Sequence, residues 1–143
     1  MTVKDILAVK GGDVATVDPT ADLATAAKML AARRIGALLV LGPDRRVAGI
    51  LSERDIVRAV ADGGSAALEQ PVSSVMTRKV VSCSPIDTLN GLMELMTTGK
   101  FRHLPVLDDD QLVGVISIGD VVKWRLQEME HEQNELRDYI RTA

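Results

Sequence analysis

Residues 49–56 read GILSERDI, and residues 114–121 read GVISIGDV. Both segments consist of a glycine, two aliphatic residues, a serine, two variable residues, an aspartate and a further aliphatic residue, and they lie 65 positions apart. The flanking sequence repeats as well, because residues 35–40 match residues 101–106 at an offset of 66. Self-similarity of this length indicates an internal duplication, so one supersecondary unit is expected twice.

Each copy predicts the same order of elements, which is strand, helix, strand, strand, helix. In the first copy these are a strand at 15–17, a helix with apolar residues from Leu23 to Leu30, strands at 35–41 and 47–51, and a helix that begins at Ser52. In the second copy they are a strand at 80–83, a helix with apolar residues from Leu89 to Met96, strands at 101–107 and 112–116, and a helix that begins at Ser117. The expected fold class is therefore α+β, built from two β-α-β-β-α repeats.

Glycine, serine and proline residues mark the link between the copies, at 63–65 and at Pro71. Short apolar segments, 3–7 and 72–76, precede the two copies and correspond at an offset of 69. We expect the first repeat at residues 1–68, the second at 69–126, and a C-terminal helical extension at 127–143.

The last helix of the second copy meets no terminator until near the end of the sequence, so it should be long. Its apolar residues recur at spacings of four and three, which is a heptad pattern with one polar position. The stripe consists of Val122, Leu126, Met129, Gln133, Leu136 and Ile140. A partner helix or a second copy of the chain would cover it. Alternatively it packs on the chain's own core, because the stripe is shorter than the ~3–4 heptads of a typical coiled coil.

Composition excludes several classes of protein. The 143 residues are 46% hydrophobic, which suffices for one compact domain or two small units with a shared core. Lys and Arg number 17 against 20 Asp and Glu, and only three residues are aromatic, so neither a nucleic acid nor an anionic membrane is an expected partner. The single cysteine, Cys83, excludes an intrachain disulfide and a cysteine-cluster zinc site. With no signal-peptide pattern and no membrane-spanning apolar run, a cytoplasmic protein is expected.

The repeated serine and aspartate have the spacing of a helix capping box, in which each side chain bonds the backbone N–H of the other residue. A single such motif after a strand is most simply a cap. Two copies at strand-to-helix junctions also suggest a binding role, because free N–H groups and the positive end of a helix attract anions there. An ionised aspartate can accept hydrogen bonds from both vicinal hydroxyls of a ribose.

The repeated unit, with its glycine-aliphatic-serine-aspartate motif and the FRHLPV segment at 101–106, resembles the CBS domain, named for cystathionine β-synthase. Two such domains in tandem form the pair called a Bateman module, and the resemblance extends from about Val3 to about Leu126. It implies two repeats related by pseudo-twofold symmetry and a regulatory module without catalytic residues. Such pairs bind AMP, ADP, ATP, NAD or S-adenosylmethionine between their copies and often form homodimers.

The resemblance also implies which residues contact the ligand. Asp55 and Asp120 would hold ribose, and Ser52 and Ser117 would lie near ribose or phosphate. Adenine would lie between aliphatic segments. These include Val14, Ile35, Gly36 and Ile50 in the first copy, and Val80, Phe101 and Ile116 in the second.

Arg102 and His103 stand where the family often supplies phosphate-binding side chains, and we expect them to reach into the cleft that contains Asp55. The first copy has Gly36 and Ala37 at the matching positions, so the cleft of Asp120 is expected to lack these cations. Arg54 is either a further phosphate contact or an ordinary surface residue of the first helical turn.

These observations favour a non-catalytic regulator that binds an adenosine-containing ligand, with AMP or another adenine nucleotide as the expected ligand and no cofactor required. No metal site or catalytic constellation is expected. A regulated partner protein would receive the signal, because no effector domain accompanies the repeats. The alternative is a dimerisation or interaction module whose ligand clefts are vestigial.

Overall fold

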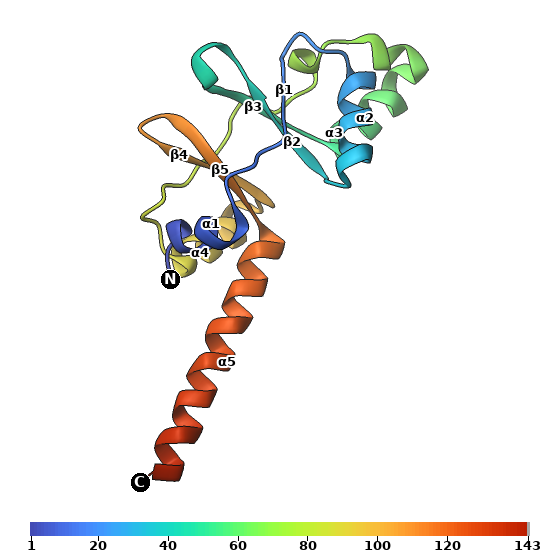
Figure 1. Cartoon of the computed structure of the whole chain (residues 1–143). Coiled ribbons are helices and arrows are strands. Elements are labelled where there is room, and N and C mark those ends of the chain that lie inside the picture. The colour runs from blue at the N-terminus through green and yellow to red at the C-terminus, as the bar shows by residue number, and fades with distance from the viewer. Residues whose placement is uncertain (143) are drawn as a thin grey trace.

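The computed structural model describes residues 1–142 and contains two small α+β units followed by one long helix (Figure 1). The first unit comprises β1 (Thr16–Val17), α2 (Leu23–Arg33), β2 (Ala37–Leu41), β3 (Val47–Ser52) and α3 (Glu53–Gly63). The second comprises α4 (Leu89–Gly99), β4 (His103–Asp108), β5 (Gln111–Ser117) and α5 (Ile118–Thr142). Helix α1 (Val3–Lys10) precedes both, and short 3-10 turns at Gly64–Glu69 and Val72–Ser74 join them. The predicted fold class is confirmed.

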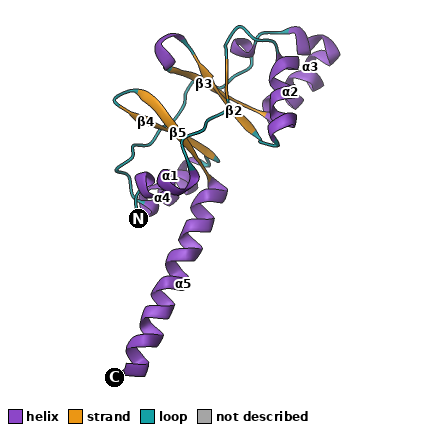
Figure 2. Ribbon diagram, in the orientation of Figure 1, coloured by secondary structure: helices purple, strands orange, loops and turns teal. Residues whose placement is uncertain are grey.

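Each unit is a small sheet with helices packed on it (Figure 2). In the first unit β1 pairs with β2 in parallel, and β2 pairs with β3 antiparallel. In the second unit β4 and β5 form an antiparallel hairpin. The turns that join each pair of strands contain residues with positive φ, namely Asp44, Arg45, Asp109 and Asp110. Aspartate tolerates this left-handed region better than most residues.

The strand predicted at 80–83 forms only one isolated parallel bridge, between Cys83 and Val106, so this part of the prediction is wrong. In the first unit the Leu39 N–H donates to the Ala15 carbonyl at 3.2 Å, which helps to hold β1 on β2. Pro105 occupies the position equivalent to Leu39, and proline has no N–H to donate. The ladder therefore stops at Cys83.

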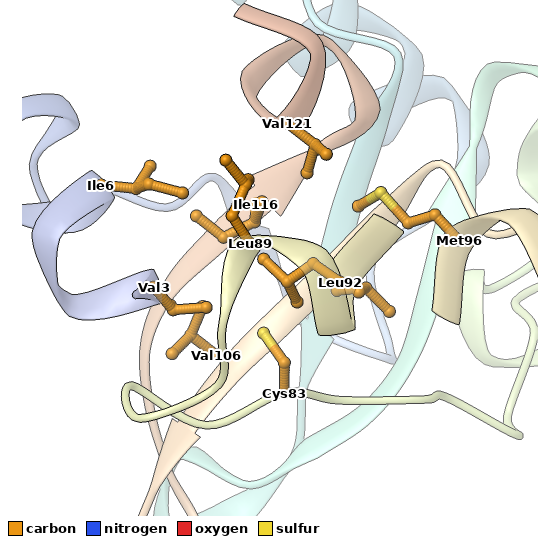
Figure 3. Close-up of a cluster of buried hydrophobic side chains, with 10 residues drawn as sticks. Val3, Ile6, Cys83, Leu89, Leu92, Met96, Val106, Ile116 and Val121 are labelled. Atoms are coloured by element: carbon orange, nitrogen blue, oxygen red, sulfur yellow. The ribbon is translucent and has the colours of Figure 1, made fainter. Parts of the chain in front are cut away.

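The two hydrophobic cores are built crosswise from the chain. Val3 and Ile6 of α1 are fully buried among the core residues of the second unit, as Figure 3 shows. Val72 and Met76, from the link between the copies, are buried in the core of the first unit. The segment that precedes the first repeat thus packs in the core of the second unit, and the segment that precedes the second repeat packs in the core of the first. The predicted boundaries at residues 68/69 and 126/127 remain a prediction.

Helix α5 leaves the second unit and projects away from the rest of the molecule (Figure 1). Val121 is buried in the second unit, whereas every described residue from Met129 onward is exposed. The heptad stripe therefore does not pack on the core of its own chain. Within residues 1–142 no helix is both long and apolar enough to cross a membrane.

Candidate functional site

A cavity of about 620 Å³ lies between the two units. One wall comes from the first unit and the segment before it, and the other comes from the β4–β5 hairpin. Its lining residues are Lys10, Asp13, Val14, Ala15, Arg33, Ile35, Gly36, Ala37, Leu38, Leu39, Ile50, His103, Val115 and Ser117. The volume falls within the ~300–1,000 Å³ range of small-molecule sites.

The wall from the first unit is mainly aliphatic. Val14 and Ala15 lead into β1, Ile35 and Gly36 lead into β2, and Ile50 lies on β3. These segments are neighbours because Thr16 pairs with Leu39, and Leu39 pairs with Ile50 across the sheet. The resulting surface suits a flat apolar group, while backbone groups next to the strand ends can bond its polar edge.

The opposite wall carries the polar groups of the second copy. The antiparallel register of the hairpin places His103 directly across from Ser117. Ser117 and Asp120 form a capping box, since the Ser117 N–H donates to the Asp120 carboxylate at 2.9 Å and the Asp120 N–H donates to the Ser117 hydroxyl at 3.1 Å. Ser117 lines the cavity immediately before α5, and its hydroxyl also donates to the Asp120 carboxylate at 3.0 Å.

Lys10, the last residue of α1, connects the N-terminal helix to this cap. Its ammonium donates to the Val115 carbonyl at 2.8 Å and forms a salt bridge with the Asp120 carboxylate. Burial raises the pKa of Asp120, but hydrogen bonds from Lys10 and Ser117 outweigh that effect and lower the pKa below its ordinary value. Asp120 is therefore ionised at neutral pH and available as a hydrogen-bond acceptor.

The environment of His103 favours its neutral form, in contrast to that of Asp120. Burial lowers the pKa of its imidazole, and the positive charges of Lys10 and Arg102 lower the pKa further, against an opposing effect from Asp120. The neutral form of the ring is therefore favoured at pH 7. A negative group bound beside it would favour the charged form.

The structure groups the site residues differently from the sequence-based prediction. His103 was expected in the cleft of Asp55, yet hairpin pairing places it beside Ser117 and Asp120 of its own copy. Arg102, an exposed residue, also stays with that copy, because its carbonyl accepts the Ile118 N–H at 2.8 Å. Sequence alignment of the repeats could not show this, because it does not reveal which strand edges face one another.

Gly36 and Ala37 line the same cavity as Ser117, as expected for the cleft near Asp120. Within their own unit they also lie next to the first capping box. Ala37 pairs with Ser52, and the Glu53 N–H donates to the Gly36 carbonyl at 3.0 Å. His103 and the small residues Gly36 and Ala37 therefore line the same cavity.

Asp120 is bonded to two lining residues, Lys10 and Ser117, but is not itself one of the lining residues. The other predicted residues also lie outside this cavity. Ser52 and Asp55 form the first capping box, with the Ser52 N–H donating to Asp55 at 2.9 Å, but neither lines the cavity. Arg54 is exposed on α3. Val80 and Phe101 are half-buried, and Ile116 is fully buried in the core of the second unit. Their roles in ligand binding remain predictions.

The two basic residues of the cavity lining, Lys10 and Arg33, were missed by the sequence analysis. A signal for Lys10 existed, because it matches Lys79 at the offset of 69 that relates the two leading apolar segments. Arg33 stands in the last turn of α2, where a basic residue is common for other reasons, so no signal distinguished it.

Two other chemistries find no support in the described residues. No group of three or more His, Cys, Asp or Glu side chains in residues 1–142 is arranged to hold a metal ion. Burial raises the pKa of Cys83 to about 12, and this side chain lies in the core of the second unit. Its thiol is a packing group rather than a nucleophile.

Comparisons with known proteins agree on one family. The model of the CBS domain matches residues 3–62 and 72–127, which coincide with the two copies. A mitochondrial CBS domain-containing protein of Arabidopsis thaliana is 32% identical over 149 residues, covering 97% of this chain and 71% of that protein. A solved CBS-domain-containing protein from Agrobacterium tumefaciens is 51% identical with a TM-score of 0.83, covering 87% of this chain and 99% of that one.

A second solved structure was determined with a ligand. The CBS domain protein from Pyrobaculum aerophilum, complexed with AMP, is 28% identical to this chain. Its TM-score is 0.74, and the match covers 84% of this chain and 89% of that one.

Proposed function

Since the chain belongs to the CBS domain family, as a tandem pair of repeats, we propose that it is a non-catalytic regulatory module that binds an adenosine-containing ligand. The observation that carries the proposal is the cavity in which an aliphatic wall meets Ser117, His103 and the basic side chains of Lys10 and Arg33, with the Asp120 carboxylate bonded to both Lys10 and Ser117. Adenine matches the aliphatic wall, ribose hydroxyls match the acceptors, and phosphate matches the cations. The AMP complex of the Pyrobaculum aerophilum relative supports the same ligand class.

The ligand would lie with adenine between Val14, Ile35 and Ile50 and with its ribose toward Ser117 and Asp120. His103 and Lys10 would then face the phosphate, and Arg102 stands next to His103 in the chain. Lys10 has a double role, because its ammonium pairs with the Asp120 carboxylate and would share that carboxylate with ribose. AMP, ADP, ATP and NAD all contain adenosine and differ in the groups attached through its phosphate. Asp55 and Ser52 would form a second, weaker site.

Ligand occupancy would act by changing the relation between the two units or between the subunits of a homodimer, and a separate protein would read that change. Binding shifts such an equilibrium only by its difference in affinity for the two states. The cavity is suited to this role because both units contribute to its walls, so a bound ligand contacts both at once.

Isothermal titration calorimetry of the purified chain with AMP, ATP, NAD and S-adenosylmethionine tests the proposal. We expect saturable binding of AMP, and a loss of roughly tenfold or more in Asp120→Asn, because hydrogen bonds to charged groups contribute about 1.5–3 kcal/mol. Asp138→Asn makes the same change on the exposed part of α5 and should bind as the wild type does.

Lys10→Met provides a second variant that leaves the capping box intact. It should weaken AMP by roughly tenfold and adenosine much less, because a charged contact is lost only for the phosphorylated ligand. Silence toward all four ligands would overturn the sensor and favour a dimerisation module with vestigial clefts. Equal affinities for wild type, Asp120→Asn and Lys10→Met would overturn the placement of the site.

A further inference from the structure

Helix α5 carries an apolar stripe that its own chain leaves uncovered. Five of the six stripe positions are large hydrophobic residues whose exposed fractions lie between 44% and 64%. They are Val122, Leu126, Met129, Leu136 and Ile140, and Gln133 is the sixth position. The face of α5 that meets the second unit is a different one, where Val121 is buried and Trp124 packs against the core. The stripe is therefore free for another partner.

The distal half of α5 has no tertiary support within residues 1–142. Every described side chain from Met129 to Thr142 is exposed, so no packing on the chain's own core stabilises these turns. Isolated helices shorter than about 12–15 residues are marginal in water. Such a helix is stabilised when its apolar face is buried. We therefore expect a second helix to cover the stripe.

The charged residues beside the stripe identify that second helix. In heptad terms Leu126, Gln133 and Ile140 take the a positions, and Val122, Met129 and Leu136 take the d positions. The flanking g positions include Arg125 and Glu132, and the flanking e positions include Glu130 and Arg137.

We propose that α5 forms a parallel, in-register, two-stranded coiled coil with α5 of a second copy of this chain. In that arrangement each g residue faces the e residue five positions further along the other helix. Arg125 then faces Glu130 of the second copy, and Glu132 faces Arg137 of the second copy. Both contacts pair opposite charges, and the twofold symmetry makes each of them twice. All six stripe positions meet their own equivalents, so Gln133 faces a second Gln133 with which its amide can exchange hydrogen bonds.

The antiparallel arrangements fit less well. With full overlap, e faces e and g faces g, so Glu130 would face Glu130, Glu132 would face Glu132, and Lys123 would face Arg137. Each of these contacts joins like charges. A shifted antiparallel pair can bring Lys123 to Glu130 and Arg125 to Glu132, but it leaves Leu136 and Ile140 beyond the overlap. Only the parallel pair satisfies both the charges and the whole stripe.

A charge exchange in the full-length chain tests the pairing. Glu132→Arg places arginine against Arg137 of the second copy, and Arg137→Glu places glutamate against Glu132. Each variant alone should weaken self-association by roughly tenfold, because two attractive contacts become repulsive. An equimolar mixture of the two variants should associate as tightly as the wild type, because opposite charges face each other again in the mixed dimer. Sedimentation equilibrium measures all three dissociation constants.

Asp138→Arg is the matched control, since it reverses a charge on the outward side of the same helix and should leave the dissociation constant unchanged. A shifted antiparallel pair predicts another outcome, in which Glu132→Arg weakens association and Arg137→Glu does not. That result would overturn the parallel coiled coil, as would equal dissociation constants for the wild type and both variants.

Disulfide trapping gives an independent readout. Leu136→Cys should form a disulfide-linked dimer in a glutathione redox buffer, because the two Leu136 positions share one layer. Asp138→Cys should not, because the two positions point away from each other. The native Cys83 does not interfere, since it is buried in the core. Equal trapping of both variants, or of neither, would overturn the proposal.

The coiled coil deepens the dimer part of the proposed function, and its failure can be told apart from failure of ligand binding. The charge-exchange variants lie outside the cavity, so calorimetry with AMP on the same proteins tests the ligand site separately. Loss of the coiled coil with retained AMP binding would contradict this inference alone.

Discussion

Lys10 joins three parts of the molecule through one ammonium group. It ends α1, donates to a carbonyl of β5 and pairs with the capping carboxylate of α5. This arrangement places a positive charge next to two titratable groups, Asp120 and His103. Positive charge from Lys10 keeps Asp120 ionised, and it also disfavours a second positive charge on His103. The charge of the cavity is thus set by a residue far from the repeated motif in the sequence.

The lowered pKa of His103 predicts a dependence of stability on pH. Because this pKa lies below the ordinary unfolded value of about 6.5, the unfolded chain binds more protons than the folded chain as pH falls through that value. The free energy of unfolding should therefore decrease from pH 7.5 to pH 5.5, and His103→Gln should decrease less. Urea denaturation at both pH values measures this difference.

His131→Gln is the matched control, because His131 is exposed on α5. Comparison of the two variants separates the effect of His103 from the general effect of replacing a histidine. An equally steep decrease in His103→Gln would show that the half-buried imidazole of His103 is not the group responsible for the pH dependence.

At the scale of single elements, the glycine that opens each repeated motif has a steric function. A Cβ at Gly49 would lie 2.7 Å from the Thr77 carbonyl oxygen and 2.7 Å from the Met76 sulfur. A Cβ at Gly114 would meet only the side chain of Leu7, at 2.7 Å. In both units the apolar segment that precedes a repeat crosses the strand at its glycine. The motif glycine therefore permits the close contact that binds that segment to the sheet.

This difference predicts unequal effects of the same substitution in two equivalent positions. Gly49→Ala should lower the free energy of unfolding by about 2–3 kcal/mol, because the obstructing Thr77 atom belongs to the backbone. Gly114→Ala should lower it by only about 1 kcal/mol, because the tip of Leu7 can rotate away. Chemical denaturation of the two variants compares them directly, and each is the other's control. A larger effect at Gly114 would contradict this explanation.

At the scale of the whole molecule, the crossed cores make the N-terminal helix part of the second repeat. The Val3 N–H donates to the Asp87 carbonyl at 2.9 Å, and the Val72 N–H donates to the Ala21 carbonyl at 2.7 Å, so each leading segment is bonded to the start of a repeat. These two contacts occupy equivalent positions in the two units. A disturbance of α1 should therefore act on the second unit, although the first unit follows α1 directly in the sequence.

Ile6→Ala tests this coupling. The side chain is fully buried in the second core, so its truncation should lower the free energy of unfolding by about 2–5 kcal/mol. Hydrogen exchange should accelerate more in β4 and β5 than in β2 and β3, because the lost contacts belong to the second unit. Val9→Ala changes an exposed residue of the same helix and should alter neither measurement. Faster exchange confined to the first unit would contradict the crossed arrangement.

Local patterns sufficed to predict most of the elements. The repeat, the two capping boxes and the helices and strands around them follow from side-chain periodicity and capping chemistry, which depend on near neighbours in the chain. The strand predicted at 80–83 is absent because Pro105 has no N–H to donate. This could be anticipated from the sequence only by noticing that Pro105 is equivalent to Leu39. The candidate site was predicted less completely. Val14, Ile35, Gly36, Ile50, His103 and Ser117 do line one cavity, whereas Lys10 and Arg33 were missed.

The amino-acid sequence alone suffices to predict a duplicated α+β unit, a capped helix after the last strand of each unit, and a heptad stripe on the final helix. Tertiary contacts alone establish which capping box lies beside His103, that Lys10 forms a salt bridge with Asp120, that each leading segment packs in the core of the other unit, and that the heptad stripe is left uncovered. The physical reason is the range of the interactions. Capping and periodicity act within a few residues, while the cavity depends on strand register and on contacts between groups such as Lys10 and Asp120 that lie 110 residues apart.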